Sequence, residues 1–288
     1  MTEVGSRFAQ VVEAKIARLS GYRVEQIASV SYGDASWPML CVRSERWEEN
    51  RPTVLISGGV HGDEPAGVHA TLAFLADGRR EFDDALQFVV FPCVNPSGFD
   101  ADTLETASGA NLNRLFGVNS TQPEVRAIEN WLCLQALRFR MTFDLHEVRP
   151  DYVGEGFVQK DNPRAAYLYE TVTDGSERIG RLMIDALPSS RPVCDWPTIY
   201  DDINRAGVIS YPEACRNKIY AEGTSFDAFL GRRYTGHSFT PETPTGWSLS
   251  DRVDTHLTFL KVALWHAVPK SFGGMRNRAS RWQRPGRS

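Results

Sequence analysis

Residues 54–65 read VLISGGVHGDEP, an apolar run that enters a pair of glycines and then presents a histidine and a glutamate three positions apart. The run 54–56 is typical of a buried strand, and Pro65 stands where a helix can begin, because its fixed φ suits the first helical position. His61 and Glu64 are therefore predicted to lie in a turn at the carboxyl edge of a sheet, where open α/β sheets bind ligands. An imidazole nitrogen and a carboxylate oxygen are suitable zinc ligands, and a catalytic zinc needs a third protein ligand.

The 288-residue chain has the composition of an ordinary globular protein, with a net charge of −4. Its first 20 residues mix charged and apolar positions, so they predict an amphipathic helix instead of a signal peptide. No apolar run is long enough to span a membrane. The five cysteines are scattered without a CxxC pair, which indicates reduced thiols. We therefore expect a cytoplasmic protein that binds neither membranes nor nucleic acid.

The chain contains no internal repeat, low-complexity linker or clear domain break, so we expect a single domain over residues 1–269. Residues 270–288 form a tail with six basic residues and no acidic residue. Such a tail can dock on nucleic acid or on an acidic neighbouring subunit, but a solvated, poorly ordered terminus is the simpler prediction. The sequence leaves the oligomeric state open.

The apolar and periodic segments predict the secondary structure of this domain. Predicted strands cover residues 22–31, 38–42, 53–58, 86–93, 141–145, 193–200 and 208–211. Predicted helices cover the first 20 residues and residues 65–76, 123–137, 162–187, 225–232 and 250–268. The order strand, helix, strand over residues 53–93 indicates a parallel βαβ unit. We therefore expect an α/β fold with three layers, α/β/α, around a mixed, mostly parallel twisted sheet.

The loop over residues 95–121 is too long and too polar for a simple connection, so we interpret it as functional. It contains the neighbouring pair Asn113 and Arg114. Thr121, at the end of the loop, is a possible cap of the helix that follows.

Two further candidates follow apolar strands directly. His146 follows the predicted strand 141–145, and Glu213 follows the predicted strand 208–211. Because neighbouring strands of one sheet can bring distant residues together, we expect both side chains to approach the turn that carries the first histidine. His146 is then the third metal-ligand candidate.

The order of these motifs over about residues 53–216 resembles the zinc carboxypeptidase family, which includes the succinylglutamate desuccinylase and aspartoacylase branch. The segment NPSG at residues 95–98 also looks like the NPxG turn of that family. The resemblance implies one zinc ion per chain, bound by His61, Glu64 and His146. It also implies a carboxypeptidase-like α/β/α fold.

The same resemblance assigns roles to three other residues. Asn113 and Arg114 correspond to the pair that binds the substrate carboxylate, and Glu213 corresponds to the general base. The implied activity is hydrolysis of a C-terminal peptide or amide bond by a zinc-activated water. The implied substrate is a small peptide or an N-acyl amino acid.

The chain departs from the family pattern in two places. Carboxypeptidases carry an additional arginine before the Asn-Arg pair, but residues 96–112 contain no arginine. Arg149 and Arg216 are the possible replacements by position. The substrate-covering tyrosine of the family has no clear counterpart, and Tyr200 is the candidate.

Two other functions remain open at this point. An N-acyl amino acid deacylase of the desuccinylase type uses the same metal ligands, and its LNRxF motif matches residues 112–116. Members of that branch carry a C-terminal β domain, whereas the residues after Glu213 predict mostly helix and a basic tail. The second alternative is a binding protein that keeps the fold without catalysis.

Overall fold

The computed structural model describes residues 6–211 and 224–272. Within these ranges, ten strands form one sheet with the order β1-β2-β4-β3-β5-β10-β6-β9-β8-β7. The strands are β1 (Tyr22–Tyr32), β2 (Ala35–Ser44), β3 (Thr53–Gly58), β4 (Gln87–Phe91), β5 (Met141–Val148), β6 (Tyr167–Val172), β7 (Thr198–Ile199), β8 (Asp202–Arg205), β9 (Val208–Tyr211) and β10 (His237–Pro244).

The sheet is mixed, with parallel pairing at its centre. Strands β4, β3, β5 and β10 run parallel to one another, and β6 is parallel to β9. The pairing is antiparallel between β10 and β6 and at both ends of the sheet. The parallel strands β3, β5 and β10 therefore direct their carboxyl ends to the same edge of the sheet.

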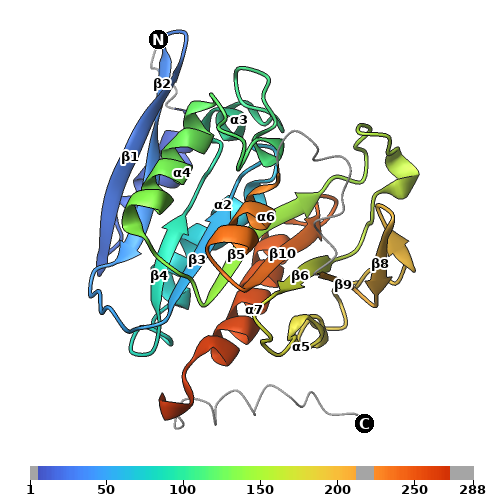
Figure 1. Ribbon diagram of the computed structural model, residues 1–288. Coiled ribbons are helices and arrows are strands. Elements are labelled where there is room, and N and C mark those ends of the chain that lie inside the picture. The colour runs from blue at the N-terminus through green and yellow to red at the C-terminus, as the bar shows by residue number, and fades with distance from the viewer. Residues whose placement is uncertain (1–5, 212–223, 273–288) are drawn as a thin grey trace.

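Helices cover both faces of this sheet, as Figure 1 shows. The α-helices of the described residues are α1 (Ala14–Ile16), α2 (Pro65–Ala73), α3 (Pro96–Ala101), α4 (Pro123–Gln135), α5 (Gly180–Asp185), α6 (Phe226–Arg233) and α7 (Leu249–Ala267). Short π and 3-10 turns cover Ala9–Glu13, Phe74–Gly78, Leu112–Arg114, Gln159–Asp161 and Lys270–Phe272. No helix among the described residues has the length and apolar character that crossing a bilayer requires.

Two hydrophobic cores lie on the two faces of the sheet. The larger core joins α2 and α7 to side chains such as Val54, Ile56 and Phe143. The second core joins α4 and α6 to the opposite face, where Leu55 and Val89 lie. Neighbouring residues of β3 thus point into different cores, and every residue of β3 is buried. The alternation explains the continuous apolar run of this strand, and it confirms the predicted three-layer α/β/α fold.

The predictions hold best around the opening motif. Strand β3 has the predicted bounds, α2 begins at the predicted Pro65, and β1 and β2 form the predicted hairpin. Thr121 was predicted to cap α4, but Gln122 takes the N-cap position and makes no side-chain cap, because Pro123 supplies the fixed φ of the first turn. The functional loop 95–121 contains the short helix α3 and the 3-10 turn that carries the Asn-Arg pair.

The prediction was wrong between residues 162 and 205. The expected long helix is replaced by strand β6 and the short helix α5, because the apolar residues near 167 lie in a sheet instead of on one helical face. The expected strand 193–200 is reduced to β7, and β8 was not predicted. The predicted strand 208–211 is β9.

Strand β10 is the most consequential element that the sequence reading missed. It lies between β5 and β6, at the centre of the sheet, although it contains Pro241 and ends at Pro244. Proline cannot donate a ladder hydrogen bond, so a run with two prolines ordinarily argues against a central strand. Here the strand is retained because its other residues pair with both neighbours. Of the basic tail, only residues 270–272 lie within the described ranges.

Candidate active site

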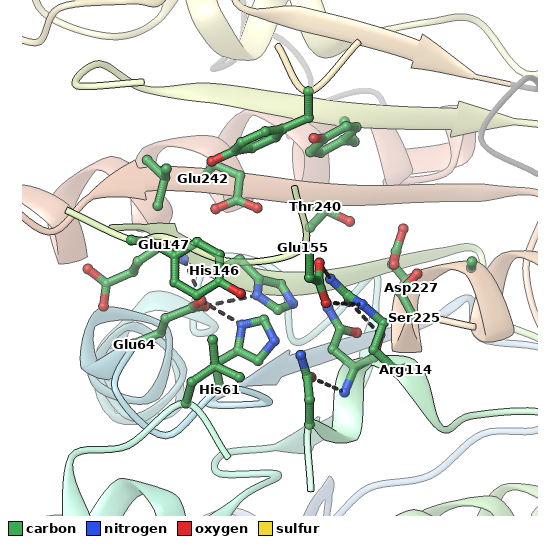
Figure 2. A pocket seen from close by; sticks show the side chains of 18 of the residues that line it. His61, Glu64, Arg114, His146, Glu147, Glu155, Ser225, Asp227, Thr240 and Glu242 are labelled. Carbon is green, nitrogen blue, oxygen red and sulfur yellow. Dashed lines mark hydrogen bonds and ion pairs between the residues drawn. The ribbon is translucent and has the colours of Figure 1, made fainter. Parts of the chain in front are cut away.

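A pocket lies beside the carboxyl ends of β3, β5 and β10 (Figure 2). Most of its polar lining comes from strand ends and from the loops that follow them. Its chemically active lining residues include His61, Glu64, Asn113, Arg114, His146, Glu147, Arg149, Glu155, Tyr200, Asp227 and Glu242. Six site residues were predicted, and the five that the structure describes line this one pocket, together with residues that the sequence did not indicate.

The turn that carries His61 depends on glycines. Gly59 has a φ of +66°, and a Cβ atom there would lie 2.6 Å from the side chain of Val68. A Cβ atom on Gly62 would lie 2.0 Å from the backbone carbonyl carbon of Gly98, in α3. Because neither position has room for a side chain, the turn packs directly against neighbouring backbone and holds His61 in a fixed place.

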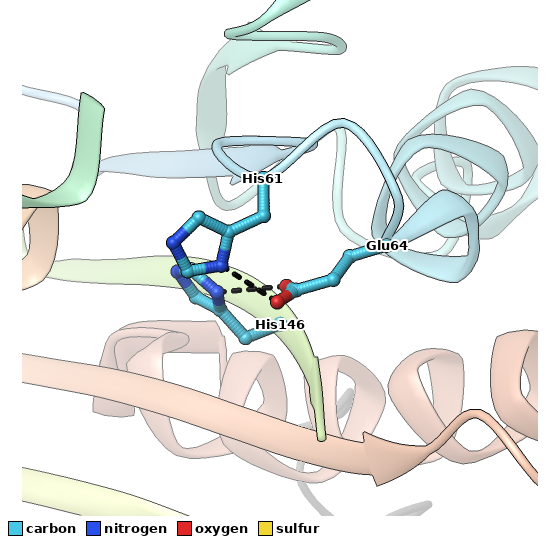
Figure 3. Close-up of side chains that lie close together, drawn as sticks. All are labelled: His61, Glu64 and His146. Carbon is cyan, nitrogen blue, oxygen red and sulfur yellow. Dashed lines mark hydrogen bonds and ion pairs between the residues drawn. The ribbon is translucent and has the colours of Figure 1, made fainter. Parts of the chain in front are cut away.

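Three predicted metal ligands come together at the base of the pocket (Figure 3). Nδ1 of His61 lies 2.6 Å from Oε1 of Glu64, and Nδ1 of His146 lies 2.8 Å from Oε2 of the same carboxylate. One ligand atom from each of the three residues lies within 4.8 Å of the others. All three residues are buried, so this cluster of polar groups is held by the protein interior.

A second set of contacts orients these side chains. Nε2 of His146 lies 2.9 Å from Oδ2 of Asp144, and the other oxygen of Asp144 accepts a hydrogen bond from Ser57 at 2.8 Å. The backbone N–H of Glu147 donates to Oε2 of Glu64 at 2.9 Å. The Nε2–Asp144 contact leaves Nδ1 of His146 as the nitrogen that faces the other two ligands.

Charge–charge interactions act strongly in this cluster. Burial by itself raises the pKa of Glu64, but the imidazoles of His61 and His146 outweigh it and place the pKa well below its ordinary value. Burial also lowers the pKa of His146, but the carboxylates of Asp144 and Glu64 raise it well above normal. Without a metal, the carboxylate is thus held ionised between two imidazoles.

The donor set fits a zinc ion on its chemistry. Two imidazole nitrogens and one carboxylate converge, no thiolate takes part, and a buried carboxylate supports the far nitrogen of one imidazole. Three protein ligands leave a coordination position open, which distinguishes catalytic from structural zinc sites. Catalysis also needs groups that bind the substrate and transfer protons, and these must come from the rest of the pocket.

The predicted pair Asn113 and Arg114 lies on the opposite wall of the pocket. Oδ1 of Asn113 accepts a hydrogen bond of 2.9 Å from the backbone N–H of Phe226, at the start of α6. The guanidinium of Arg114 meets Glu155 through two hydrogen bonds, of 2.9 Å from Nε and 2.6 Å from Nη2. Asn113 therefore fixes the turn against α6, and Arg114 presents its fork to the pocket (Figure 2).

Glu213, the predicted general base, lies outside the described residues. A different carboxylate, Glu242, lines the pocket from β10, where it stands beside His146 in the parallel register. Burial, opposed by His146, raises the pKa of Glu242 well above its ordinary value. The side chain of Glu242 is half-buried, and it makes no hydrogen bond or ion pair to another residue within 6–211 and 224–272. The sequence TPETP around Glu242 does not predict a strand, so the sequence did not indicate that this glutamate lies in the pocket.

Three residues were candidates to replace missing family features, and the two that the structure describes are engaged in contacts within the protein. Arg149 lines the pocket, but its guanidinium donates to Asp63 at 2.7 Å and also contacts Asp151. Tyr200 lines the pocket and donates its hydroxyl to Asn162 at 2.8 Å. Arg216, the other candidate, lies outside the described residues.

Comparisons of sequence agree with the motifs. The family model of the succinylglutamate desuccinylase/aspartoacylase catalytic domain matches residues 50–150. Carboxypeptidase SOL1 of Arabidopsis thaliana is 32% identical over 117 residues, a match that covers 34% of this chain and 23% of that protein. The chain thus aligns with less than a quarter of the length of this curated relative.

Comparisons of structure agree with the fold. A protein described as a metallopeptidase from Shewanella amazonensis superposes with a TM-score of 0.72 at 24% identity, covering 91% of this chain and 93% of that one. A similarly described protein from Shewanella denitrificans gives 0.69 at 25% identity, with 91% and 90% covered. A metallo-carboxypeptidase from Burkholderia cenocepacia gives 0.63 at 19% identity, with 92% and 69% covered. These likenesses show a shared fold.

Proposed function

We propose that the chain is a zinc-dependent hydrolase that cleaves an amide bond next to a free carboxylate, and its resemblance to the zinc carboxypeptidase-like family in motifs and fold supports this. One observation carries the proposal. The cluster of His61, Glu64 and His146 shares a pocket with the guanidinium of Arg114 and with the half-buried carboxylate of Glu242. This combination provides for metal binding, for recognition of an anion and for proton transfer.

We propose that His61 and His146, through Nδ1, and the carboxylate of Glu64 hold one zinc ion per chain. A zinc ion in this place would supply a Lewis acid that acidifies water and polarises a carbonyl group. The contact of His146 with Asp144 keeps the imidazole in the orientation that this role requires.

We propose Glu242 as the general base. Its strand neighbour is His146, so its carboxylate enters the pocket beside the metal ligands without belonging to the cluster of three. In this role it takes a proton from water and delivers it to the nitrogen of the leaving amine. Glu213, the base implied by the family resemblance, remains the alternative, and variants of the two residues separate them.

We propose that Arg114 binds the carboxylate of the substrate and that Asn113 positions it. A guanidinium presents two parallel N–H donors, which match the two oxygens of a carboxylate. The fold supports this role because Asn113 anchors the turn to α6 while the fork of Arg114 faces the pocket.

A substrate screen tests the proposed function. Zinc-loaded protein is incubated with a panel of dipeptides, with the same dipeptides amidated at the C-terminus, and with N-acyl amino acids. We expect hydrolysis of compounds with a free carboxylate next to the scissile amide and poor turnover of the amidated ones. Equal turnover of free and amidated dipeptides would contradict the role of Arg114.

The deacylase alternative is favoured by one specific observation, the match of residues 50–150 to the desuccinylase/aspartoacylase catalytic domain. Both reactions hydrolyse an amide whose amine side carries a carboxylate, so the same pocket suits both. Preference for N-acyl amino acids over all dipeptides in the screen would identify the deacylase. Zinc binding without turnover of any compound would instead indicate a binding protein.

A further inference from the structure

Arg114 already holds a carboxylate, and that carboxylate belongs to the chain itself. Nε and Nη2 of the guanidinium donate to the two oxygens of Glu155, at 2.9 and 2.6 Å. The remaining nitrogen, Nη1, donates to the backbone carbonyl of Asn113 at 2.8 Å. The Nε–Nη2 edge is therefore filled by the bidentate geometry with which a guanidinium binds a substrate carboxylate.

We propose that Glu155 is a built-in competitor for the substrate carboxylate and thereby a specificity-determining residue of this pocket. The inference rests on the proposed role of Arg114. Two carboxylates cannot share one edge of a guanidinium, so a substrate gains this contact only when Glu155 leaves it. The carboxylate of the substrate therefore binds Arg114 by replacing the carboxylate of Glu155.

The loop that carries Glu155 presents it from a tight turn. The backbones of Gly154 and Phe157 are hydrogen-bonded in both directions, at 3.1 and 2.9 Å, and the two residues between them have positive φ values of 54° and 89°. The base of the loop is fixed more firmly, because Asn162 bonds to the carbonyl of Tyr152 and to the hydroxyl of Tyr200. The turn therefore aims Glu155 at Arg114 from a firmly held base.

The pair is accessible enough to exchange. The side chains of Arg114 and Glu155 are 23% and 29% exposed, so water can solvate the carboxylate when it leaves. Half-exposed ion pairs stabilise a protein weakly, because solvent screens them and two long side chains lose freedom. A ligand that also contacts the rest of the pocket can therefore displace Glu155.

The exchange has a consequence for selectivity. While Glu155 stays in place, it balances the positive charge of Arg114, and the acidic side chains of Glu64 and Glu242 also line the pocket. A ligand without a carboxylate leaves the pair intact. A ligand with a carboxylate replaces Glu155 and restores the charge balance. Glu155 thus weakens the binding of all carboxylate ligands. Only ligands that make enough further contacts with the pocket displace it.

Ligand binding to the chelator-treated protein tests the inference without using activity. The chelator removes any metal that could bind the carboxylate of the ligand. The probes are L-phenylalanine and L-phenylalaninamide, and the readout is the dissociation constant from isothermal titration calorimetry, which can be measured for every variant. We expect Glu155→Gln to bind L-phenylalanine about three- to tenfold more tightly than wild type, since a half-exposed ion pair no longer competes. Glu155→Asp should lie between the two, because its shorter side chain reaches the fork less well.

Three controls make the result decisive. Glu49→Gln removes one exposed carboxylate far from the pocket in sequence, so it should leave the affinity unchanged. L-phenylalaninamide should bind wild type and Glu155→Gln equally. In the background of Arg114→Lys, Glu155→Gln should no longer tighten binding, because the competition acts through the guanidinium.

The outcomes separate this inference from the proposed function. If Arg114→Lys weakens L-phenylalanine binding but Glu155→Gln leaves it unchanged or weaker, the competitor role is refuted and the carboxylate anchor stands. If Arg114→Lys binds L-phenylalanine as wild type does, both the anchor and the competitor are refuted. Tighter binding in Glu155→Gln that disappears with Arg114→Lys supports both.

Discussion

Asp144 and Glu64 lie on opposite nitrogens of one imidazole, with Oδ2 of Asp144 2.9 Å from Nε2 of His146 and Oε2 of Glu64 2.8 Å from its Nδ1. Asp144 is itself held by the hydroxyl of Ser57. The contact of Asp144 with Nε2 thus fixes the orientation of the His146 imidazole without a metal. The proposed zinc affinity should therefore depend on Asp144, a residue that is not one of the proposed ligands.

Asp144→Asn should weaken zinc binding about 10- to 100-fold, because a carboxylate that accepts from a ligating imidazole raises its basicity and fixes its orientation. The measurement is competition for zinc against a chromophoric chelator. Asp185→Asn, an exposed carboxylate on α5 that pairs with Arg181, is the matched control and should bind zinc as wild type does. Equal affinity in both variants would show that Asp144 does not support the site.

His146→Ala should abolish stoichiometric zinc, because it removes one of three protein ligands. Elemental analysis of protein purified without chelator should give one zinc per chain for wild type. The metal should be lost on dialysis against a chelator and restored by added zinc, with a rise in Tm, because a ligand that binds only the folded state stabilises it. Wild-type zinc content in His146→Ala would contradict the proposed ligand set.

Glu242→Gln should lower kcat by about 10²- to 10⁴-fold while zinc content stays near one per chain, because only the proton-transferring group is lost. The comparison is Glu213→Gln, measured on the same substrate with zinc content and Tm determined for both. If Glu213→Gln loses the activity and Glu242→Gln keeps it, the base is Glu213, as the family resemblance implied.

Arg114→Lys should lose turnover of substrates with a free carboxylate, since an ammonium group cannot reproduce the planar fork. The loss should be much smaller for the amidated forms of the same substrates, which are already poor for wild type. The measurement is kcat/KM for each free and amidated pair. Parallel losses on both forms would indicate a structural role for the arginine.

The stability of the metal-free protein should fall below pH 6.5, in part through His256. This side chain is fully buried beside the hydroxyl of Thr243, and burial lowers its pKa from 6.5 to about 3. Below pH 6.5, His256 binds a proton in the unfolded chain but stays neutral in the folded protein. The contribution of His256 to the free energy of unfolding is therefore lost as pH decreases towards 3. The limiting slope is about 1.4 kcal/mol per pH unit.

His256→Gln should therefore flatten the decline relative to wild type. Urea unfolding of chelator-treated protein at pH 7, 6, 5 and 4 measures it, and the difference between the two proteins isolates this residue from the other titrating groups. A constant difference between the two proteins at all four pH values would show that His256 is not the group concerned.

The parts of the site that the sequence predicted are those in which local chemistry and local structure coincide. His61 and Glu64 stand directly after a wholly buried strand, and His146 lies within the next apolar strand along the sheet. In each case the apolar run forces the strand into the core, and the polar residue is carried to the edge. Residue type, spacing and position then point to the same chemistry.

The parts that were missed depend on contacts distant in the sequence. Pro241 speaks against a strand locally, and only pairing with β5 and β6 explains β10. The contact between Arg114 and Glu155 joins residues 41 positions apart through a loop without periodicity. Helical propensity also misled the reading of residues 162–187, where packing against β9 and β10 determines a strand.

The late position of β10 in the chain has a consequence for biosynthesis. During translation, β5 and β6 emerge from the ribosome well before the strand that separates them in the finished sheet. Until residues 237–244 have been made, β5 keeps an unpaired edge, and such edges invite pairing with other chains. A nascent or truncated chain that ends before β10 is therefore at risk of aggregation. The turn that carries His61 and Glu64 is synthesised before β10, which supplies Glu242 to the same pocket.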